Sequence, residues 1–387
     1  MKMEPAKKMS VFTPSIFGKL KAVTAKREAQ NEKIIDLSLG SPDIPPSDLV
    51  RQTLSKESAK ADMYGYTLGG IKRFNEAVSN YYQRRSKVSL NPETEVLQTM
   101  GSQEGLVHLP LAFCNENDIV LTTNPAYVAY DAGIKLAGAI PYYMPLHAEN
   151  NFLPDLDAIP ENILEQAKLL ILNLPGNPVP AIPTKAFFEK VVSFAKKYQI
   201  IVLHDAAYSE FYFTENSPAS FLATPGAKEV GLEINSLSKS FSLAGARVAY
   251  FAGNADAIRI MREFKSNLDY GIFAPIQEAA IVALNHAEEI TDRLRKIFKE
   301  RHQILTEGLT ELGWEVTPSS GGMFIWAKYP YEIDDKEFAF KAIEQVGVVM
   351  VPGSAFGTEG KGFVRIALVQ DVEELKLALQ LLKGLDM

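Results

Sequence analysis

A lysine among hydroxyl side chains is the first feature of this sequence that could do chemistry. Lys239 lies in the run Ser-Leu-Ser-Lys-Ser, residues 236–240, and Arg247 follows eight residues after it. A lysine that attacks a carbonyl must be partly neutral, which requires burial or a nearby cation. The planar guanidinium of Arg247 could bind a phosphate group. A surface lysine in a polar loop is the alternative, and these residues alone leave both interpretations open.

A carboxylate and a phenol follow another apolar run. Asp205 and Tyr208 come after residues 200–203, so we expect Asp205 at the end of a strand and at the floor of a cleft. A buried carboxylate needs a cationic partner, and a protonated pyridine nitrogen is one. The Tyr208 hydroxyl could then reach a phenolate oxygen of the same ring. An Asp helix cap with a core tyrosine is equally compatible, and we expect the adjacent His204 to be a core histidine.

An asparagine-rich loop follows a third apolar run. Residues 173–178 read Asn-Leu-Pro-Gly-Asn-Pro, which predicts a rigid, locally hydrogen-bonded loop. Such a loop would hold the Asn177 amide as a fixed donor to a cofactor oxygen. A plain turn is the alternative.

A glycine-containing turn lies in residues 99–105, where a strand runs through Gly101 into the start of a helix. Backbone N–H groups at a helix N-terminus bind phosphate, and glycine lets the phosphate approach closely. Many helices begin after Gly-Ser, so this signal is weak by itself. Farther along, Tyr127 follows a strand and offers a face on which a flat ring could stack. Tyr130 competes for that role, and a core tyrosine is the alternative.

One arginine lies inside an apolar run near the C-terminal end. Arg365 is flanked by Gly-Phe-Val and Ile-Ala-Leu, and a buried arginine must be paired. A substrate carboxylate is the natural partner if no protein carboxylate pairs it. A structural ion pair is the alternative. The run Met323–Trp326 is expected to be core.

These candidate residues need elements that bring them together. Short apolar runs separated by amphipathic segments predict buried strands of a mostly parallel sheet flanked by helices, an α/β fold. In open parallel sheets, ligands bind beyond the carboxyl ends of the strands, where most of the candidates lie. The predicted strands are Glu95–Met100, Asp118–Thr122, Ile140–Met144, Leu169–Leu174, Ile200–His204, Val230–Asn235 and Val248–Ala252, and the clearest helices are Thr184–Tyr198 and Pro275–Gly308. We expect the second of these helices to connect two domains, either straight or bent.

The pattern changes after Leu309 and predicts a smaller α+β domain. We expect a large domain over residues 50–280, and a small one formed by residues 1–49 and 281–387. The predicted elements of the small domain are strands at Trp314–Pro318, Met323–Ala327 and Phe363–Leu368 and helices at Asp335–Val346 and Val372–Leu382.

Composition limits the possible partners and settings. The chain has 387 residues, of which 47% are hydrophobic and 22% charged, and its net charge of -7 does not suit nucleic acid or an anionic membrane as partner. Cys114 is the single cysteine, so a reducing, cytoplasmic setting is expected. Residues 1–10 are basic but no apolar core follows them, so a secretory signal is not expected. The apolar runs are too short to span a bilayer. No metal site is expected.

In their order along the chain, these motifs resemble those of the class I and II aminotransferases, pyridoxal-phosphate (PLP) enzymes of fold type I. The resemblance runs from residues 37–43 (Leu-Ser-Leu-Gly-Ser-Pro-Asp) to Arg365, and residues 236–247 are its most specific part. It implies that Lys239 holds PLP as a Schiff base and moves the substrate α-proton, and that Asp205 keeps the pyridine nitrogen protonated. It implies that Asn177 and Tyr208 bond the phenolate oxygen. The implied substrate-binding residues are Gly40, Asn177 and Arg365. The implied phosphate and ring contacts are Gly101, Ser102, Gln103, Ser236, Ser238, Arg247 and Tyr127.

The resemblance also implies a homodimer with shared active sites. Residues 265–273 are similar to a segment of the LL-diaminopimelate and alanine-type transaminases that projects into the partner's site. Tyr64 resembles a tyrosine that reaches the partner's phosphate, and Tyr66 is an alternative because the spacing to Gly69-Gly70 can be aligned in two ways. The sequence departs from the family pattern at residues 178–180 (Pro-Val-Pro) and 247–249 (Arg-Val-Ala).

The implied activity is ping-pong transamination between amino acids and 2-oxo acids, with glutamate and 2-oxoglutarate as the expected pair. A β-lyase on the same fold is an alternative, although Arg365 disfavours decarboxylation. A ligand-sensing domain without catalysis is a further alternative, but the first ~50 residues hold no convincing helix-turn-helix. The sequence does not name the amino acid, whose side chain we expect to meet loops such as Val11–Phe17 and Lys265–Phe273.

Overall fold

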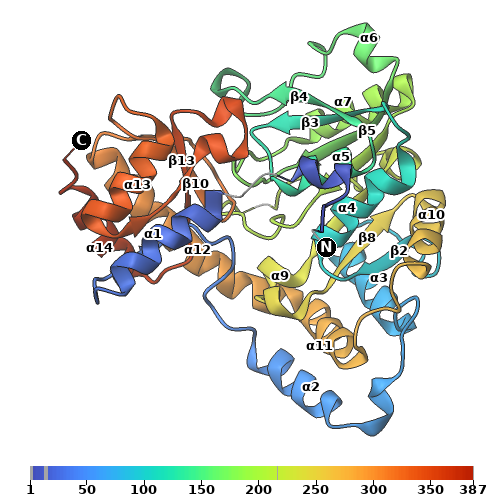
Figure 1. The fold of residues 1–387 in the computed structure, drawn as a ribbon. Coiled ribbons are helices and arrows are strands. Elements are labelled where there is room, and N and C mark those ends of the chain that lie inside the picture. Colours follow the sequence, from blue (N-terminus) through green and yellow to red (C-terminus); the bar gives the residue numbers. More distant parts are fainter. Residues whose placement is uncertain (1–2, 13–15, 216, 387) are drawn as a thin grey trace.

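The computed structural model describes residues 3–12, 16–215 and 217–386, which form two lobes (Figure 1). The larger lobe contains a seven-stranded sheet with helices on both faces, and the smaller contains a four-stranded sheet with helices packed on it. The fold is therefore α/β with a mostly parallel central sheet, as predicted.

The large sheet has the strand order β2-β8-β7-β6-β5-β3-β4. Strand β8 is antiparallel to both of its neighbours, whereas the other neighbouring pairs are parallel. All seven predicted runs are strands, with ends that differ from the prediction by one or two residues at most. Their bounds are β2 Val96–Thr99, β3 Ile119–Asn124, β4 Ile140–Pro145, β5 Ala167–Asn173, β6 Ile201–Asp205, β7 Gly231–Ser236 and β8 Ala249–Gly253.

Helices bury both faces of this sheet, which explains why its strands are apolar without alternation. Along β5, Leu170 joins a cluster with Phe188 of α7 on one face, while Ile171 joins a cluster with Leu106 of α4 on the other. The helices of the large lobe are α2 Asp48–Ser58, α3 Lys72–Ser86, α4 Ser102–Phe113, α5 Ala129–Leu136, α6 Glu161–Leu164, α7 Lys185–Tyr198, α8 Ala227–Val230, α9 Leu237–Ser240, α10 Ala255–Ser266 and α11 Ala274–Asn285.

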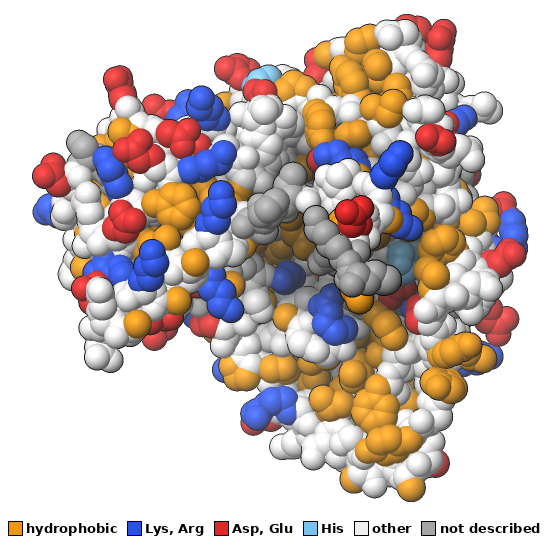
Figure 2. All heavy atoms as spheres, in the orientation of Figure 1, with side chains coloured by type: hydrophobic (Ala, Val, Ile, Leu, Met, Phe, Trp, Pro, Cys, Tyr) orange, Lys and Arg blue, Asp and Glu red, His pale blue; other side chains and the backbone are white. Residues whose placement is uncertain are grey.

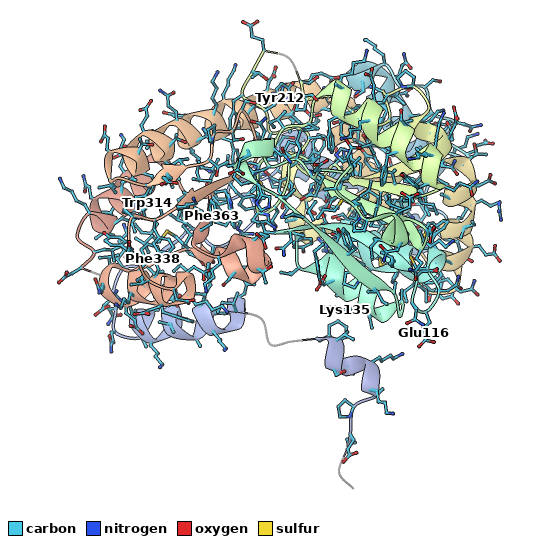
Figure 3. The ribbon with its side chains drawn as sticks, turned by 90° about the horizontal axis from the view of Figure 1, so that it is seen from above. Glu116, Lys135, Tyr212, Trp314, Phe338 and Phe363 are labelled. Atoms are coloured by element: carbon cyan, nitrogen blue, oxygen red, sulfur yellow. The ribbon has the colours of Figure 1, made fainter. Side chains whose placement is uncertain are left out.

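The small lobe is built on an antiparallel sheet with the order β12-β13-β10-β9. Its core includes Trp314 and Phe338, whose ring centroids lie 5.5 Å apart and which Figure 3 labels within this lobe. The elements are β9 Glu315–Val316, β10 Phe324–Lys328, β11 Val348–Val349, β12 Val351–Pro352, β13 Phe363–Ala367, α12 Ala287–Glu311, α13 Asp335–Val346 and α14 Val372–Leu382. Helices α13 and α14 have the predicted bounds, whereas the predicted strand at 314–318 shortens to two residues.

The N-terminal segment packs on the small lobe. Strand β1 (Ile35–Asp36) pairs in parallel with β11, and Leu20 of α1 (Ile16–Glu28) packs against Ile343 of α13. The 3-10 helices are η1 Lys7–Val11, η2 Ala61–Tyr64, η3 Ala148–Asn150, η4 Ala244–Ala246, η5 Gly353–Phe356 and η6 Thr358–Gly360.

The connecting helix expected over residues 275–308, either straight or bent, is interrupted at His286 and divided into α11 and α12. At His286 the backbone angles are φ -111° and ψ 26°, outside the α-helical region. The Arg84 side chain donates to the Leu284 carbonyl at 2.7 Å, which offers that carbonyl a partner outside the helix. The amphipathic pattern continues through the bend, so the sequence does not locate it at His286.

Within the described residues, no helix is both long and apolar enough to cross a membrane. The same residues contain no group of three or more His, Cys, Asp or Glu side chains that could hold a metal ion.

Candidate active site

The carboxyl ends of the central strands bring several predicted residues to one edge of the sheet. Asp205 is the last residue of β6 and pairs in register with Asn173, the last residue of β5. Lys239 lies in the short helix α9, which begins directly after β7. Parallel strands end at a common edge, so three segments far apart in sequence meet there.

Asp205 is a buried carboxylate with two neutral donors. The Tyr130 hydroxyl donates to Oδ2 at 2.8 Å, and the Ala207 backbone N–H donates to Oδ1 at 3.2 Å. Burial raises the pKa of Asp205, while these hydrogen bonds and the nearby His204 and Lys239 act to lower it. The carboxylate has further acceptor capacity and fits a protonated ring nitrogen. Tyr130, considered in sequence as a stacking ring, instead donates to Asp205, and no local pattern signals this contact.

Lys239 is half-buried, and its ammonium donates to the Gly40 carbonyl. Burial first, and then the positive charges of Arg365 and Arg247, lower the pKa of Lys239 to about 8, against a smaller opposing effect of Asp205. A sizeable fraction of the amine is therefore neutral just above neutral pH, as a nucleophile or a base requires.

Arg365 on β13, in the small lobe, is only 2% exposed, and it lies near enough to Lys239 for its charge to lower the pKa of that lysine. Its Nη1 donates to Asn177 Oδ1 at 2.8 Å and its Nη2 donates to the Ser38 carbonyl, while Nε has no partner among the described residues. In that part of the chain no carboxylate lies within ion-pair distance of the guanidinium, which burial leaves with a pKa lowered to about 10. A ligand carboxylate fits this unpaired cation.

Aromatic rings hold the Arg365 guanidinium in place. Its carbon lies 4.5 Å from the ring centroid of Phe324 and 4.9 Å from that of Phe356. Phe324 also contacts the ring of Tyr208, at 5.5 Å between centroids. It is fully buried, as predicted for a core residue. Phe324 lies next to Arg365 because β10 pairs with β13. The sequence around Phe324 does not indicate this pairing.

Asn177 joins the two lobes at this edge. Its side chain accepts a hydrogen bond from Arg365 and also hydrogen-bonds Tyr208. The second bond acts to lower the pKa of Tyr208, but burial has the larger effect and raises that pKa. The Asn173 side chain fixes the loop by accepting from the Asn177 backbone N–H at 2.8 Å and donating to the Asp205 carbonyl at 2.8 Å. The predicted rigid loop is thus held by the first of its two asparagines.

An anion-binding turn lies where α4 begins. Gly101 has φ 81°, and a Cβ there would overlap the guanidinium of Arg247, so arginine and helix N-terminus lie in contact. The first N–H groups of a helix have no intrahelical partner and attract anions. Ser102 and Gln103 form that first turn, and Ser236 caps α9 by accepting from the Ser238 N–H at 3.1 Å. A phosphate group fits this set of donors.

Tyr127 stands beside the turn and borders a cavity. Its hydroxyl donates to Gln103 Oε1 at 3.3 Å, and its ring meets Tyr130 edge-on at 5.7 Å. The cavity has a volume of about 690 Å³ and is also lined by Phe17 and Phe356, whose rings lie 5.9 and 4.9 Å from the guanidinium carbon of Arg365. Figure 2 shows a recess between the lobes with basic side chains inside it. Of the loop predicted to meet the substrate side chain, residues 13–15 lie outside the described residues.

Tyr64 and Tyr66 do not join this cluster within the chain. They are 66% and 83% exposed, and their rings contact Phe273 and Tyr270 at 5.2 and 5.0 Å. The Tyr64 hydroxyl donates to the Ser58 carbonyl. The single chain therefore leaves the choice between the two tyrosines open.

The reactive groups lie at the carboxyl edge of a mostly parallel sheet, and a second lobe supplies an arginine. This is the architecture of the fold type I PLP-dependent enzymes. The chain belongs to the class I and II aminotransferase family, whose model matches residues 32–382.

Named relatives and solved structures cover almost the whole chain. It is 40% identical over 385 residues to the LL-diaminopimelate aminotransferase of Desulforudis audaxviator, a match that spans 99% of this chain and 98% of the relative. The substrate-bound structure of BacF from Bacillus subtilis is 36% identical with a TM-score of 0.94, covering 99% of this chain and 98% of that one. A probable N-succinyldiaminopimelate aminotransferase from Thermus thermophilus is 34% identical with a TM-score of 0.91, covering 95% and 99%.

The protein is thus a PLP-dependent aminotransferase acting on amino acids and oxo acids, related to the LL-diaminopimelate subgroup as the sequence motifs implied. The residues present fit the cofactor. The lowered pKa of Lys239 suits the aldehyde, and the buried carboxylate of Asp205 suits the ring nitrogen. The helix N-terminus beside Arg247 suits the phosphate.

Proposed function

We propose that this enzyme transfers an amino group by a ping-pong mechanism with glutamate and 2-oxoglutarate as one pair, and that LL-diaminopimelate is the first candidate for the other amino donor. The observation that carries the proposal is the buried Arg365, which no described carboxylate pairs and which lies near Lys239. The names of the relatives support the choice of donor.

Bound PLP supplies an electron sink for the bonding pair released at the substrate Cα. Lys239 has two tasks in this scheme. As the neutral amine it would hold the cofactor covalently through the aldehyde carbon, and as a free amine it would take up the proton from the substrate Cα and later release it. Its pKa near 8 suits both directions of transfer.

Asp205 orients the ring by accepting from its nitrogen and stabilises the protonated form. Asn177 and Tyr208 donate to the ring oxygen, a role supported by their own hydrogen bond at the site. Tyr127 would pack against the ring, and the residues that would hold the phosphate are Gly101, Ser102, Gln103, Ser236, Ser238 and Arg247.

Arg365 and Asn177, with Gly40 beside them, bind the substrate α-carboxylate. This contact fixes which Cα bond stands across the ring and so directs proton loss rather than loss of CO₂. The cavity beside Tyr127 has room for a substrate side chain.

A homodimer is part of the proposal. An exposed patch of apolar side chains lies on the large lobe, and large patches of this kind mark protein interfaces. Figure 2 shows hydrophobic side chains gathering at the lower end of that lobe, near α2 and α3. In this patch Tyr64 contacts Phe273 and Tyr66 contacts Tyr270, and the exposed Leu68 and Leu268 are close to these residues in sequence. Each subunit would then offer Tyr64 or Tyr66 to its partner's phosphate.

The function is tested by mixing the holoenzyme with a panel of amino acids that begins with LL-diaminopimelate and glutamate. The cofactor absorption should change when an amino group is taken up and should revert when 2-oxoglutarate is added. Release of an oxo acid without any need for an acceptor would instead indicate a lyase. If no amino acid changed the absorption, the proposal would fail.

Lys239→Ala tests the assigned lysine. The variant should bind PLP only non-covalently, because it lacks the amine that forms the bond. After reduction with borohydride, the denatured wild-type chain should carry the added mass of the cofactor and the variant should not. Lys376→Ala, which removes an exposed lysine of α14, is the matched control and should behave as wild type. Covalent cofactor in Lys239→Ala would exclude this assignment.

A further inference from the structure

A buried lysine at the end of α10 takes no part in the site described above. Lys265 is 2% exposed, and its Nζ lies 3.0 Å from Glu104 Oε1 and 2.6 Å from Asp269 Oδ2. Taking an ammonium out of water is costly unless it is paired. Here it is shared by two carboxylates that belong to different elements.

Glu104 connects the ammonium to the phosphate-binding turn. It lies in the first turn of α4, and its Oε2 accepts from the backbone N–H of Met100 at 2.5 Å. Met100 directly precedes Gly101, the residue that touches Arg247. A lone carboxylate in this turn would repel a phosphate dianion at the same helix N-terminus. The ammonium of Lys265, which Glu104 shares with Asp269, offsets part of that charge.

Asp269 connects the same ammonium to the exposed patch. Its Oδ1 accepts from the Gly271 N–H at 2.8 Å, and Gly271 has φ 91° where a Cβ would overlap Thr67. Thr67 in turn donates to the carbonyls of Tyr270 and Ile272, at 3.1 and 2.7 Å. Residues 269–272 and the neighbouring chain at 66–67 are therefore fixed together, and they carry two of the exposed tyrosines of the patch.

We propose that Lys265 is a positioning residue that joins the phosphate-binding turn to the subunit interface, so that cofactor binding and dimer formation strengthen each other. The inference rests on the proposed function, since it uses the phosphate site and the homodimer. The link runs within one chain, through Met100, Glu104, Lys265, Asp269 and Gly271. Thermodynamic coupling is reciprocal, so the cofactor should tighten the dimer by the factor by which the dimer tightens the cofactor.

The test measures two equilibria in wild type and in Lys265→Met. The first is the dissociation constant of the dimer, by sedimentation, for apoenzyme and for holoenzyme. The second is the affinity of the apoenzyme for PLP and, as a probe of the turn alone, for inorganic phosphate by calorimetry. In wild type the apo and holo dimer constants should differ by roughly 5- to 150-fold, the usual range of such coupling. In Lys265→Met this ratio should be smaller than in wild type, because only the contact of the partner's tyrosine with the phosphate would still couple the two equilibria, and phosphate should bind more weakly.

A second variant guards against misfolding, because Lys265→Met leaves Glu104 and Asp269 without their cation. The double variant Lys265→Met/Glu104→Gln removes the charge from the turn. It should regain much of the phosphate affinity, while the ratio of dimer constants stays below the wild-type value because the connection through Lys265 is still broken. Lys265→Arg should restore part of that ratio. Lys196→Met, which removes a surface partner of Glu229, is the matched control and should leave both equilibria unchanged.

A wild-type ratio of dimer constants in both Lys265→Met and the double variant would overturn the inference and leave the proposed function intact. A wild-type chain that is monomeric with and without cofactor would overturn the inference together with the proposed dimer. If Lys265→Met lost phosphate affinity and the double variant did not recover it, the claim that Lys265 offsets the charge of Glu104 would be overturned.

Discussion

At the scale of single residues, the site depends on charges that are left incompletely paired. Arg365 donates only to an amide and a carbonyl oxygen, and its Nε has no partner in the described chain. Burying such a cation without a carboxylate is unfavourable, so the arginine is poised to gain from a carboxylate ligand. The same charge helps to lower the pKa of Lys239.

Arg365→Lys should reduce kcat/KM for amino acids by roughly 10- to 100-fold, mainly through KM. Lysine keeps the positive charge but lacks the planar fork that bonds both carboxylate oxygens, and one charge-assisted hydrogen bond contributes about 1.5–3 kcal/mol. Steady-state kinetics would measure the loss. Amines without a carboxylate serve as control substrates and should react equally slowly with both enzymes. An equal loss for amines and amino acids would show that Arg365 acts on folding rather than on the carboxylate.

At the scale of elements, α12 follows the bend at His286 and connects the two lobes. This helix begins beside the large lobe and its later turns pack in the core of the small one. Near its start, Arg295 stacks on Tyr212 at 4.4 Å, and Figure 3 shows Tyr212 at the junction of the lobes. Farther along, Arg301 binds both oxygens of Asp43 at 2.7 and 2.8 Å. That pair anchors the N-terminal segment shortly after Gly40.

His302 makes α12 sensitive to pH. Burial lowers its pKa from the usual 6.5 to about 4, and its Nε2 has no partner among the described residues. The unfolded chain therefore takes up a proton near pH 6.5, whereas the folded chain does so only near pH 4. Between these values the unfolded state binds more protons, so stability should fall as the pH drops from about 6.5 toward 4 and stay constant above that window.

Thermal denaturation of wild type and His302→Gln at pH 7 and pH 5 would test this prediction. The melting temperature of wild type should fall more between the two values than that of the variant, which lacks the titrating ring. The other histidines are the same in both proteins, so their contributions cancel in the comparison. Equal decreases would contradict the assignment.

At the scale of the whole molecule, the reactive groups come from both lobes. The large lobe supplies Lys239 and Asp205, and the small lobe supplies Arg365, with Asn177 hydrogen-bonded to that arginine across the junction. The division at residues 50 and 280 stays a prediction, as does the homodimer. The exposed tyrosines suggest that each site is completed by a third segment, from a second subunit.

Shared sites would allow defective subunits to complement one another. Lys239→Ala subunits should be inactive, and subunits in which Tyr64 or Tyr66 is changed to Phe should retain cofactor poorly. In a hybrid dimer, one site would combine the intact lysine of one subunit with the intact tyrosine of the other. After subunit exchange, the mixture should reach roughly a quarter of wild-type activity, because half of the dimers are hybrids with one good site each. Only the tyrosine that reaches the partner's phosphate should complement. Activity equal to the mean of the two parents would contradict shared sites.

Much of the fold was readable from the sequence because both faces of the central sheet are buried. Its strands are therefore short apolar runs, and seven of them were predicted within two residues. The capped amphipathic helices α13 and α14 were predicted with their bounds. A bend in the connecting helix was considered, but its position at His286 could not be given because apolar periodicity continues through it. The two-residue strands β1, β11 and β12 were missed because so short a run carries no pattern.

The sequence by itself determined the chemistry: a lysine, a carboxylate, a phenol and an arginine stand at strand ends or within a strand, in an order that indicates the aminotransferase family. Tertiary structure alone decided which of these groups touch. Tyr130 donates to Asp205, Phe324 supports Arg365, and Lys265 joins two segments far apart in the chain. Such contacts depend on which strands and helices are neighbours in space. Local residue patterns indicate burial and periodicity, but they do not indicate which elements lie next to each other.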